Sequence, residues 1–385
     1  MQEDRQIIHM DQDAFFVAVE TRKNRDLEGK PVIIGSPSDR GVVASCSYTA
    51  RKYGIHAAMP SRMAKQLCPH AIFIRGNMDE YTRASQEVTT FLTEKVPLFE
   101  KASIDEHYID LTGMERYFGC MKFAHELRAS IMKETHLPIS LGLSVNKTIS
   151  KMATNKCKPH GEREVKQTNI RSFLDPLSIK KIPGLGSSTY LKLSEMGVRH
   201  IHKLIRIPPE MMMKMMGQAG LTLWQKANGI DPSPIVPYRE QQSIGTQSTF
   251  SADSMDVVAI KALLAGMVTN IAYELRQKRK LTACITVTIR YTNFETVTKQ
   301  AKIPYTSLDH LLIAKAKELF DQVYNRRMLL RLVGVKLSHL VGGHEQISLY
   351  ETSEKRYNLY QVMDNMRNRY GDKAVQLASS LALDW

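Results

Sequence analysis

The sequence predicts an α+β protein that is built from several domains. At 385 residues the chain is too long for one compact core, because a domain usually takes about 100–200 residues. Residues 6–145 alternate between strand-like and helix-like patterns, and a proline cluster near residue 234 separates them from a second mixed stretch. Both observations favour separate α+β units joined by a stiff linker.

The first part of the chain has the pattern of a mixed α/β layer. Its expected elements, in chain order, are a strand at 6–13, a helix from Ala14, strands at 31–35 and 41–46, a helical stretch at 76–100, a hairpin at 101–110, a helix at 122–133, a strand at 138–145 and a helix from Asn146. Strand, helix, strand hairpin, helix and strand is the order of a split βαβ, ferredoxin-like layer.

Asp105 and Glu106 are adjacent carboxylates between short apolar, β-prone runs. Neighbouring side chains of a regular strand point to opposite faces, so the two can serve one site only if the chain turns or bulges there. A hairpin apex would offer them as hard oxygen ligands for a cation such as Mg²⁺. A solvated acidic turn is the plainer alternative.

A second acidic cluster, Asp11 and Asp13, lies where the first strand leads into a helix. A carboxylate in this position is a candidate metal ligand, and the backbone carbonyl of Gln12 is another. The alternative is that Asp11 or Asp13 only caps the helix.

Tyr48 and Arg51 lie three residues apart in a helix-like run, so on a helix they share a face. A hydroxyl beside a planar cation with several donors suits phosphate oxygens. The alternative is a surface arginine beside a half-buried tyrosine.

From Phe173 onward the pattern becomes helical. The segment 182–190, with Gly184 and Gly186 between helices, resembles a helix-hairpin-helix, whose glycine turn presents backbone N–H groups to a DNA phosphate. We expect the methionine-rich stretch 211–216 to lie in the core of this helical domain.

Pro232, Pro234 and Pro237 predict an extended linker. The stretch beyond it carries a helical pattern that Ser254 could cap, then alternating residues near 283–290, a second helix near 308–324 and a strand near 330–339. This predicts a small α+β domain.

Positive charge is concentrated in that last domain. Residues 243–342 hold 14 Lys or Arg and 7 Asp or Glu, a surplus of +7 within a net charge of +14 for the chain. The densest run is 276–280. A solvated face is the common explanation for such a run, but its place behind a linker favours contact with a nucleic-acid backbone.

The composition narrows the class of protein. A charge of +14 favours a polyanionic partner, with nucleic acid first and an anionic membrane surface second. The five scattered cysteines show neither zinc-site spacing nor a disulfide framework, which fits a reducing compartment. With no signal-peptide pattern and no expected membrane-spanning run, we expect a soluble, cytoplasmic protein.

Four ordered motifs resemble those of the Y-family translesion DNA polymerases, in the branches of bacterial DNA polymerase IV and the UmuC-like proteins. The motifs, within a match of roughly 6–350, are residues 8–16, 48–54, 103–106 and 143–147. The resemblance implies a right-hand polymerase with a ferredoxin-like palm (1–20 and 75–166), small fingers (21–74), a helix-hairpin-helix thumb (167–233), a linker (234–242) and an α+β little finger (243–342).

The resemblance also implies roles for individual residues. The family's metal ligands fall on Asp11, Asp105 and Glu106, with the carbonyl of Gln12, and would hold two Mg²⁺ ions. The aromatic steric gate, which would collide with a ribose 2′-hydroxyl, falls on Phe16. The nucleotide-binding positions are Phe15, Phe16, Tyr48, Arg51 and Lys158, and the candidate DNA contacts are Gly184, Gly186, Arg276, Lys278, Arg279, Lys280 and Arg290.

Residues 343–385 would form a clamp-binding peptide and a tail. Residues 346–350, with Gln346, Leu349 and Tyr350, look like the peptide with which bacterial polymerases dock on the sliding clamp. A weakly amphipathic helix through Met363 and Met366 follows, with a break at Gly371.

Three departures from the family pattern stand out. His107 takes the place of a small residue beside the metal ligands, which could change the packing there. Ser187 and Ser188 replace lysines that often follow the hairpin glycine, and the charged segment 162–165 replaces an apolar strand.

The expected function is template-directed, low-fidelity DNA synthesis past damaged bases by a monomer that binds primer-template DNA, deoxynucleoside triphosphates and a sliding clamp. A catalytically dead relative would not need all three carboxylates. A nucleotidyl cyclase would not need the thumb, the basic domain or the clamp peptide, and a plain nucleic-acid-binding protein leaves the carboxylates unexplained.

Overall fold

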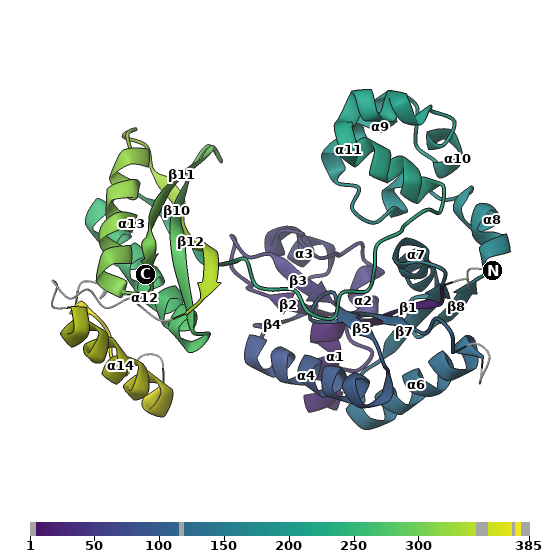
Figure 1. Ribbon diagram of the computed structural model, residues 1–385, viewed down its shortest axis with the longest axis horizontal. Helices are drawn as coiled ribbons and strands as arrows, with labels where there is room; N and C mark the ends of the chain where they lie inside the picture. The colour runs from purple at the N-terminus through teal and green to yellow at the C-terminus, as the bar shows by residue number, and fades with distance from the viewer. Residues whose placement is uncertain (1–4, 115–118, 344–352, 372–373, 379–385) are drawn as a thin grey trace. The chain divides into compact units, whose positions relative to one another are not determined.

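The computed structural model describes residues 5–114, 119–343, 353–371 and 374–378. They belong to two compact units, Met1–Arg239 and Glu240–Trp385. The first contains two sheets and a group of helices, and the second contains a third sheet with its own helices (Figure 1).

A five-stranded sheet organises the first unit, with the order β5-β6-β1-β7-β8. Its strands are β1 (Ile7–Gln12), β5 (Phe99–Lys101), β6 (Glu106–Asp110), β7 (Ile139–Ser144) and β8 (Glu162–Val165). The strand pairs are antiparallel except β7 with β8. This is the expected ferredoxin-like palm.

Helices cover both faces of the palm sheet (Figure 1). Helices α1 (Phe15–Lys23), α4 (Met78–Lys95) and α6 (Cys120–Thr135) share one hydrophobic core with Ile8 and Met10 of β1. Helix α7 (Lys147–Cys157) packs against β1 and β7 on the other face. Because side chains alternate along a strand, His9 and Asp11 of β1 lie on the α7 side.

The charged segment 162–165 does form a strand, β8, despite its departure from the apolar pattern. It can do so because it lies at the edge of the sheet, where charged side chains remain accessible to water. Arg128 of α6 binds a Glu162 carboxylate oxygen at 2.7 Å and also the carbonyls of Ile139 and His160.

A small three-stranded sheet corresponds to the expected fingers. It has the order β3-β2-β4, with β2 (Val32–Gly35), β3 (Val43–Cys46) and β4 (Ile72–Ile74), and it packs with the short helices α2 (Tyr48–Arg51) and α3 (Ser61–Leu67). A 3₁₀ turn, η1 (Arg25–Leu27), precedes it.

The expected thumb is helical. Its elements are η2 (Gln167–Asn169), α8 (Ile170–Leu174), η3 (Ile179–Lys181), α9 (Ser187–Glu195), α10 (Ile201–Leu204) and α11 (Pro209–Ala227). The prediction that the methionine stretch forms core is mostly wrong: Met212 is fully buried, but Met211, Met213 and Met215 are exposed on α11. On a surface helix only the residues of one stripe can face the core.

The proline-rich segment is not a free spacer over its first half. Ile235 is buried against Ile7 and Tyr108 of the palm, and the N–H of Val236 donates to Glu100 Oε2 at 2.9 Å. Arg239 also binds Glu100. The boundary between the two units therefore falls after Arg239, inside the expected linker 234–242.

The second unit is a four-stranded sheet of order β11-β10-β12-β9 with one face covered by helices. Its elements are β9 (Ser243–Ser254), α12 (Val257–Gln277), β10 (Lys280–Tyr291), β11 (Thr296–Thr306), α13 (Asp309–Val323), β12 (Leu330–Gly342) and α14 (Ser353–Tyr370). The sequence patterns missed β9 and β11, which are mostly exposed edge strands. The cap of α12 is Asp256, not Ser254.

Among the described residues, α12 has the length and hydropathy of a membrane-spanning helix, although the sequence patterns predicted no such segment. Its apolar residues Ile260, Leu264 and Val268 are buried in the core of the second unit. A buried core helix can have the same length and hydropathy as a membrane-spanning helix, so the hydropathy of α12 is weak evidence for a membrane.

Candidate active site

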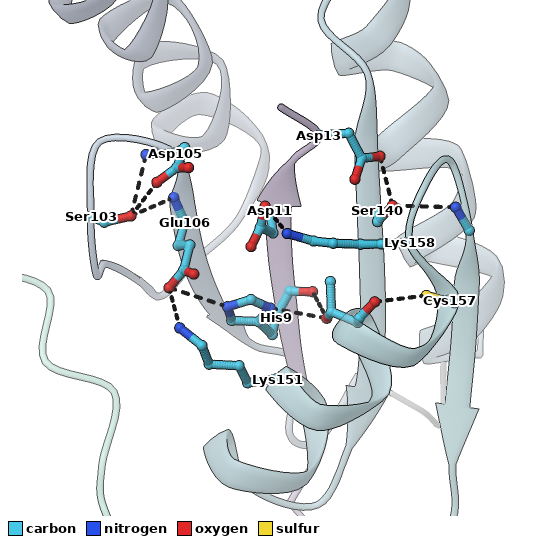
Figure 2. Close-up of polar contacts among 12 residues, drawn as sticks. His9, Asp11, Asp13, Ser103, Asp105, Glu106, Ser140, Lys151, Cys157 and Lys158 are labelled. Atoms are coloured by element: carbon cyan, nitrogen blue, oxygen red, sulfur yellow. Dashed lines mark hydrogen bonds and ion pairs between the residues drawn. The ribbon is translucent and has the colours of Figure 1, made fainter. Parts of the chain in front are cut away.

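The register of β1 against β6 brings the two acidic clusters together. Asp11 is the direct cross-strand partner of Glu106. The turn before β6 is held by Ser103, whose Oγ accepts from the N–H of Glu106 at 3.0 Å and donates to Asp105 Oδ1 at 2.6 Å. The expected turn at Asp105 therefore exists, and it presents all three carboxylates at one end of the sheet (Figure 2).

Two lysines from the α7 side of the sheet neutralise Asp11 and Glu106. Lys158, just after α7, pairs with Asp11, and Lys151 of α7 binds Glu106 Oε2 at 2.5 Å. Burial raises the pKa of Asp11 to about 7, although Lys158 acts in the opposite direction. Burial would also raise the pKa of Glu106, but the Lys151 ammonium, which binds its Oε2, holds it below the usual range.

This environment fits a divalent cation. Asp11 is almost fully buried and its charge depends on a neighbouring cation, which the partly exposed Lys158 supplies in this structure. Carboxylate oxygens are the ligands that Mg²⁺ prefers. Asp105, whose carboxylate is hydrogen-bonded to Ser103, lies near enough for its charge to help raise the pKa of Asp11.

His9 is the member of this cluster that sequence reasoning missed. Its ring nitrogen and the carboxylate oxygens of Asp11 and Glu106 all lie within 4.8 Å of one another. The signal was present in the sequence: residues i and i+2 of a strand share a face, so His9 had to point the same way as Asp11.

Asp13 has a structural role rather than that of a helix cap. Its Oδ1 accepts from the Tyr48 hydroxyl at 3.0 Å, and its Oδ2 accepts from Ser140 Oγ and the N–H of His160. Helix α1 has no side-chain cap, so the capping alternative for Asp11 and Asp13 is wrong. Asp13 instead fixes Tyr48 and the turn after Lys158.

Tyr48 and Arg51 do share one face of α2, as their spacing predicts. The Arg51 guanidinium lies 4.4 Å from the centre of the Tyr48 ring. Burial, together with the Asp13 carboxylate, raises the pKa of Tyr48, so its hydroxyl remains a hydrogen-bond donor at neutral pH.

Phe16 and Phe15 have different environments. The Phe16 ring is partly exposed and stacks on Tyr81 with 4.4 Å between ring centres and 14° between planes. The Tyr81 hydroxyl donates to Glu20 Oε1 at 2.8 Å, and this hydrogen bond holds the Tyr81 ring in place. Phe15 is buried in the palm core, so its side chain does not face a nucleotide and only its backbone N–H could contact one.

His107 does not disturb the carboxylates, because it points to the opposite face of β6 from Glu106. It is buried beneath α4, where its Nε2 lies 3.3 Å from Thr89 Oγ1. Burial lowers the pKa of His107 to about 3, aided by the nearby Lys101. The imidazole is therefore neutral in the folded chain.

A neutral buried histidine makes stability depend on pH. The unfolded chain binds a proton at His107 below about pH 6.5 while the folded chain does not, so the free energy of unfolding should fall by up to about 1.4 kcal/mol per pH unit between pH 6.5 and about 3. Urea unfolding of the parent and of His107→Leu at pH 7, 6 and 5 measures this. The variant should have a shallower acid slope, and equal slopes would contradict the assignment.

The expected DNA contacts of the thumb lie at the start of α9. Gly184 has φ +89°, which favours glycine, and Gly186 precedes the first turn of the helix. Ser187 and Ser188 occupy that first turn, so backbone N–H groups rather than lysines are available there.

The prediction that Arg276 contacts DNA is wrong. Its guanidinium is buried, donating to Asp309 of α13 at 2.5 Å, to both carboxylate oxygens of Asp364 of α14 and to the carbonyl of Ser307. Lys278 and Lys280 pair with Glu274 and Glu240. Arg279 is exposed, and Arg290 of β10 bonds Thr296 at its Nε while remaining partly exposed.

The pair Arg276 and Arg279 gives a matched test. Arg276→Ala should destabilise the second unit by about 3–5 kcal/mol, because it leaves Asp309 and Asp364 as buried charges without their partner. Arg279→Ala should leave stability unchanged. It should reduce the slope of log DNA affinity against log salt concentration by about 1, the value for one lost phosphate contact. Hydrogen exchange in α12 and α13 and DNA titrations across salt check both. Lost DNA affinity with unchanged stability for Arg276→Ala would contradict this assignment.

The clamp-binding residues Gln346, Leu349 and Tyr350 lie outside the described residues. Helix α14, which follows them, packs on the second unit through Asp364, Tyr360 and Met363.

Known proteins resemble the chain over most of its length. The impB/mucB/samB family matches residues 10–155, and the C-terminal domain of the same family matches 241–349. DNA polymerase IV of Streptococcus agalactiae is 37% identical over 90% of this chain and 96% of its own length. DNA polymerase IV of Dehalococcoides mccartyi is 34% identical over 98% of both chains.

Solved structures agree. A Y-family DNA polymerase chimera of Dbh and Dpo4 superposes with a TM-score of 0.79 and 27% identity, covering 88% of this chain and all of the other. An insertion ternary complex of Dbh DNA polymerase gives a TM-score of 0.62 over the same shares.

The multidomain α+β fold, the carboxylate site on its palm and these relatives define a DNA-directed DNA polymerase of the translesion class. The chain belongs to the impB/mucB/samB family of Y-family DNA polymerases.

Proposed function

We propose that the chain extends primers past damaged template bases with low fidelity, by nucleotidyl transfer that uses two Mg²⁺ ions. The observation that carries the proposal is the pairing of Asp11 with Glu106 at one end of the palm sheet, with Asp105 in the turn directly before Glu106. Tyr48, Arg51 and Lys158, the cation and hydroxyl donors expected for a triphosphate, are linked to the same site through Asp13 and Asp11.

Asp11, Asp105 and Glu106, with the carbonyl of Gln12, would hold the metal ions. Bound Mg²⁺ would activate the primer 3′-hydroxyl as a nucleophile and offset charge on the triphosphate. The attacking oxygen bonds to the α-phosphorus as the bond to pyrophosphate breaks.

The chain's own cations would act on the leaving group. Tyr48 and Arg51 would donate hydrogen bonds to the β- and γ-phosphates. Lys158 pairs with Asp11 in this structure, so it would exchange that carboxylate for a phosphate oxygen when metal and nucleotide bind. The amide N–H groups of the first turn of α1, which includes Phe15, are further candidate donors.

Low fidelity is supported by the small side chains on the fingers. Gly41 is buried and contacts Ser36, so it does not reach a base pair. Ala44 of β3 is exposed, and Val42, two residues before it, is exposed on the same face. Short side chains would press weakly on a nascent pair and reject few mismatched or damaged bases.

DNA contact by the second unit is supported by the open face of its sheet. Thr288, Arg290, Thr298 and Lys336 lie on the side away from the core residues Ile289 and Val335. A row of hydroxyl and cationic groups suits a phosphate backbone. Sequence reasoning found only Arg290 on this face, because the residues of the face are dispersed over three strands. We propose this open face as the main DNA surface of the second unit, with Lys278, Arg279 and Lys280 at its edge. On the thumb, we propose that Gly184 and Gly186 contact DNA.

Primer extension on undamaged and abasic templates tests the function. We expect the parent to insert a nucleotide opposite the abasic site and extend beyond it, and Asp105→Ala to do neither. A parent enzyme that copies undamaged DNA but always stops before the lesion would remove the translesion role.

The clamp peptide is a separate proposal. Deleting residues 346–350 should abolish stimulation of primer extension by a bacterial sliding clamp, because the peptide is the proposed docking element, and should spare extension without the clamp. Stimulation that survives the deletion would show that the clamp binds elsewhere. We further propose that the enzyme acts as a monomer in the cytoplasm.

A further inference from the structure

His9 is a fully buried polar residue that the proposed mechanism does not use. It lies on β1, two residues before Asp11, with its ring 4.7 Å from the ring of Tyr108. At physiological pH a histidine ring is mostly neutral, and the neutral ring offers one nitrogen lone pair.

The contact with Thr154 decides which nitrogen carries the proton. Thr154 Oγ1 lies 2.9 Å from His9 Nδ1 and 3.0 Å from the carbonyls of both His9 and Ser150. A hydroxyl has one proton, and the two carbonyls can only accept, so the hydroxyl donates to a carbonyl and accepts from Nδ1–H. The lone pair of His9 is thus on Nε2.

Tight packing of α7 keeps this arrangement rigid. Gly142 of β7 lies directly beneath the helix, and a Cβ there would come within 2.3 Å of the Ser150 carbonyl and 2.6 Å of the Thr154 nitrogen. The helix can therefore approach close enough for Thr154 to reach the His9 ring. The contact with Thr154 orients the imidazole. In metal sites, a hydrogen bond from the ring nitrogen that does not bind the metal orients a histidine ligand in the same way.

The Nε2 side of the His9 ring points toward Glu106 in the carboxylate cluster (Figure 2). His9 Nε2 has no hydrogen-bond partner among the described residues and lies 3.6 Å from Glu106 Oε2. A lone pair and a carboxylate oxygen that face each other in a buried site repel unless a cation lies between them. Lys151 and Lys158 partly supply this charge from side chains that are 26% and 21% exposed, so a bound metal ion could take their place.

We propose that His9 Nε2 is a ligand, together with Asp11 and Glu106, for a divalent first-row transition-metal cation. The proposal rests on the carboxylate site of the proposed function and extends it to metal selectivity. Imidazole nitrogen binds transition metals more readily than Mg²⁺, which strongly prefers oxygen. The site should therefore bind Mn²⁺ in the absence of DNA and nucleotide, through a nitrogen and carboxylate oxygens.

Mn²⁺ binding to the full-length chain, without DNA or nucleotide, tests the proposal. Electron paramagnetic resonance of free and bound Mn²⁺ gives the affinity, and spin-echo modulation reports a ¹⁴N nucleus bonded to the ion. We expect the parent to show nitrogen coupling. His9→Phe, which keeps an aromatic ring against Tyr108, should lose the coupling and bind Mn²⁺ at least about tenfold more weakly.

Three further variants control the experiment. His200→Phe removes an exposed histidine of the thumb and should bind Mn²⁺ as the parent does. Thr154→Ser keeps the hydroxyl that orients His9, so this variant should retain the nitrogen coupling. Asp11→Asn should weaken the nitrogen coupling. If His9→Phe fails to fold by circular dichroism, His9→Gln takes its place.

Equal Mn²⁺ affinity in the parent and in His9→Phe would overturn the proposal. Weaker binding by His9→Phe with no nitrogen coupling in the parent would also overturn it, because His9 would then only position Glu106. Primer extension by the parent with Mg²⁺ is read separately. Its absence would count against the polymerase mechanism without altering the result of the Mn²⁺ binding measurement.

Discussion

Asp11→Asn is expected to lower the rate of templated primer extension by about a thousandfold or more. Asparagine has nearly the same shape as aspartate, but it lacks the charge needed to hold a metal ion beside Glu106. Loss of one group that stabilises developing charge usually costs about 10²–10³ in rate, and here the whole cation site is weakened. Single-turnover incorporation of one nucleotide measures the effect without interference from product release.

Asp110→Asn is the matched control for this prediction. Asp110 lies at the other end of β6, opposite Ile7, where its Oδ1 accepts from the N–H of Thr112. An asparagine can accept the same hydrogen bond, so the rate should not change. If Asp11→Asn retained a rate within about threefold of the parent, Asp11 could not be a metal ligand in the chemical step.

Phe16→Ala is expected to reduce the preference for deoxynucleotides over ribonucleotides by about a hundredfold. The Phe16 ring is held against Tyr81, and its removal leaves space for a 2′-hydroxyl. Steric discrimination by one side chain is typically worth about 10–200-fold. The ratio of kcat/KM for a deoxynucleotide to that for the matching ribonucleotide measures the effect.

Phe15→Leu separates this role from packing. Phe15 belongs to the palm core, so its replacement should lower stability but leave sugar selection unchanged. Phe16 would not be the steric gate if Phe16→Ala left the ratio of kcat/KM for deoxynucleotides to that for ribonucleotides unchanged. The same conclusion would follow if both variants lowered this ratio equally.

The sequence predicted the parts of the site that depend on local pattern. The strand at 6–13 and the hairpin at 101–110 are short, regular elements, and their alternation determines which side chains face together. Spacing on a helix likewise predicted that Tyr48 and Arg51 share a face. Such local relations follow from backbone geometry alone.

The errors arose where distant segments decide the outcome. Arg276 looked like a DNA contact because it lies in a basic run, but its partners Asp309 and Asp364 are 33 and 88 residues away. The prediction of a stiff, extended linker did not include the contact of Val236 with Glu100, because nothing in the sequence of the proline-rich segment indicates this contact. Strand alternation already places His9 on the same face as Asp11, but its contacts with Thr154 and Glu106 are formed only in the fold.

Insertion of a single nucleotide opposite each of the four template bases, with Mg²⁺, tests the central claim most directly. The parent should insert the complementary nucleotide fastest opposite each base, and both Asp11→Asn and Asp105→Ala should abolish insertion. Insertion that ignores the template base, or that persists in the two variants, would contradict template-directed synthesis at this carboxylate site.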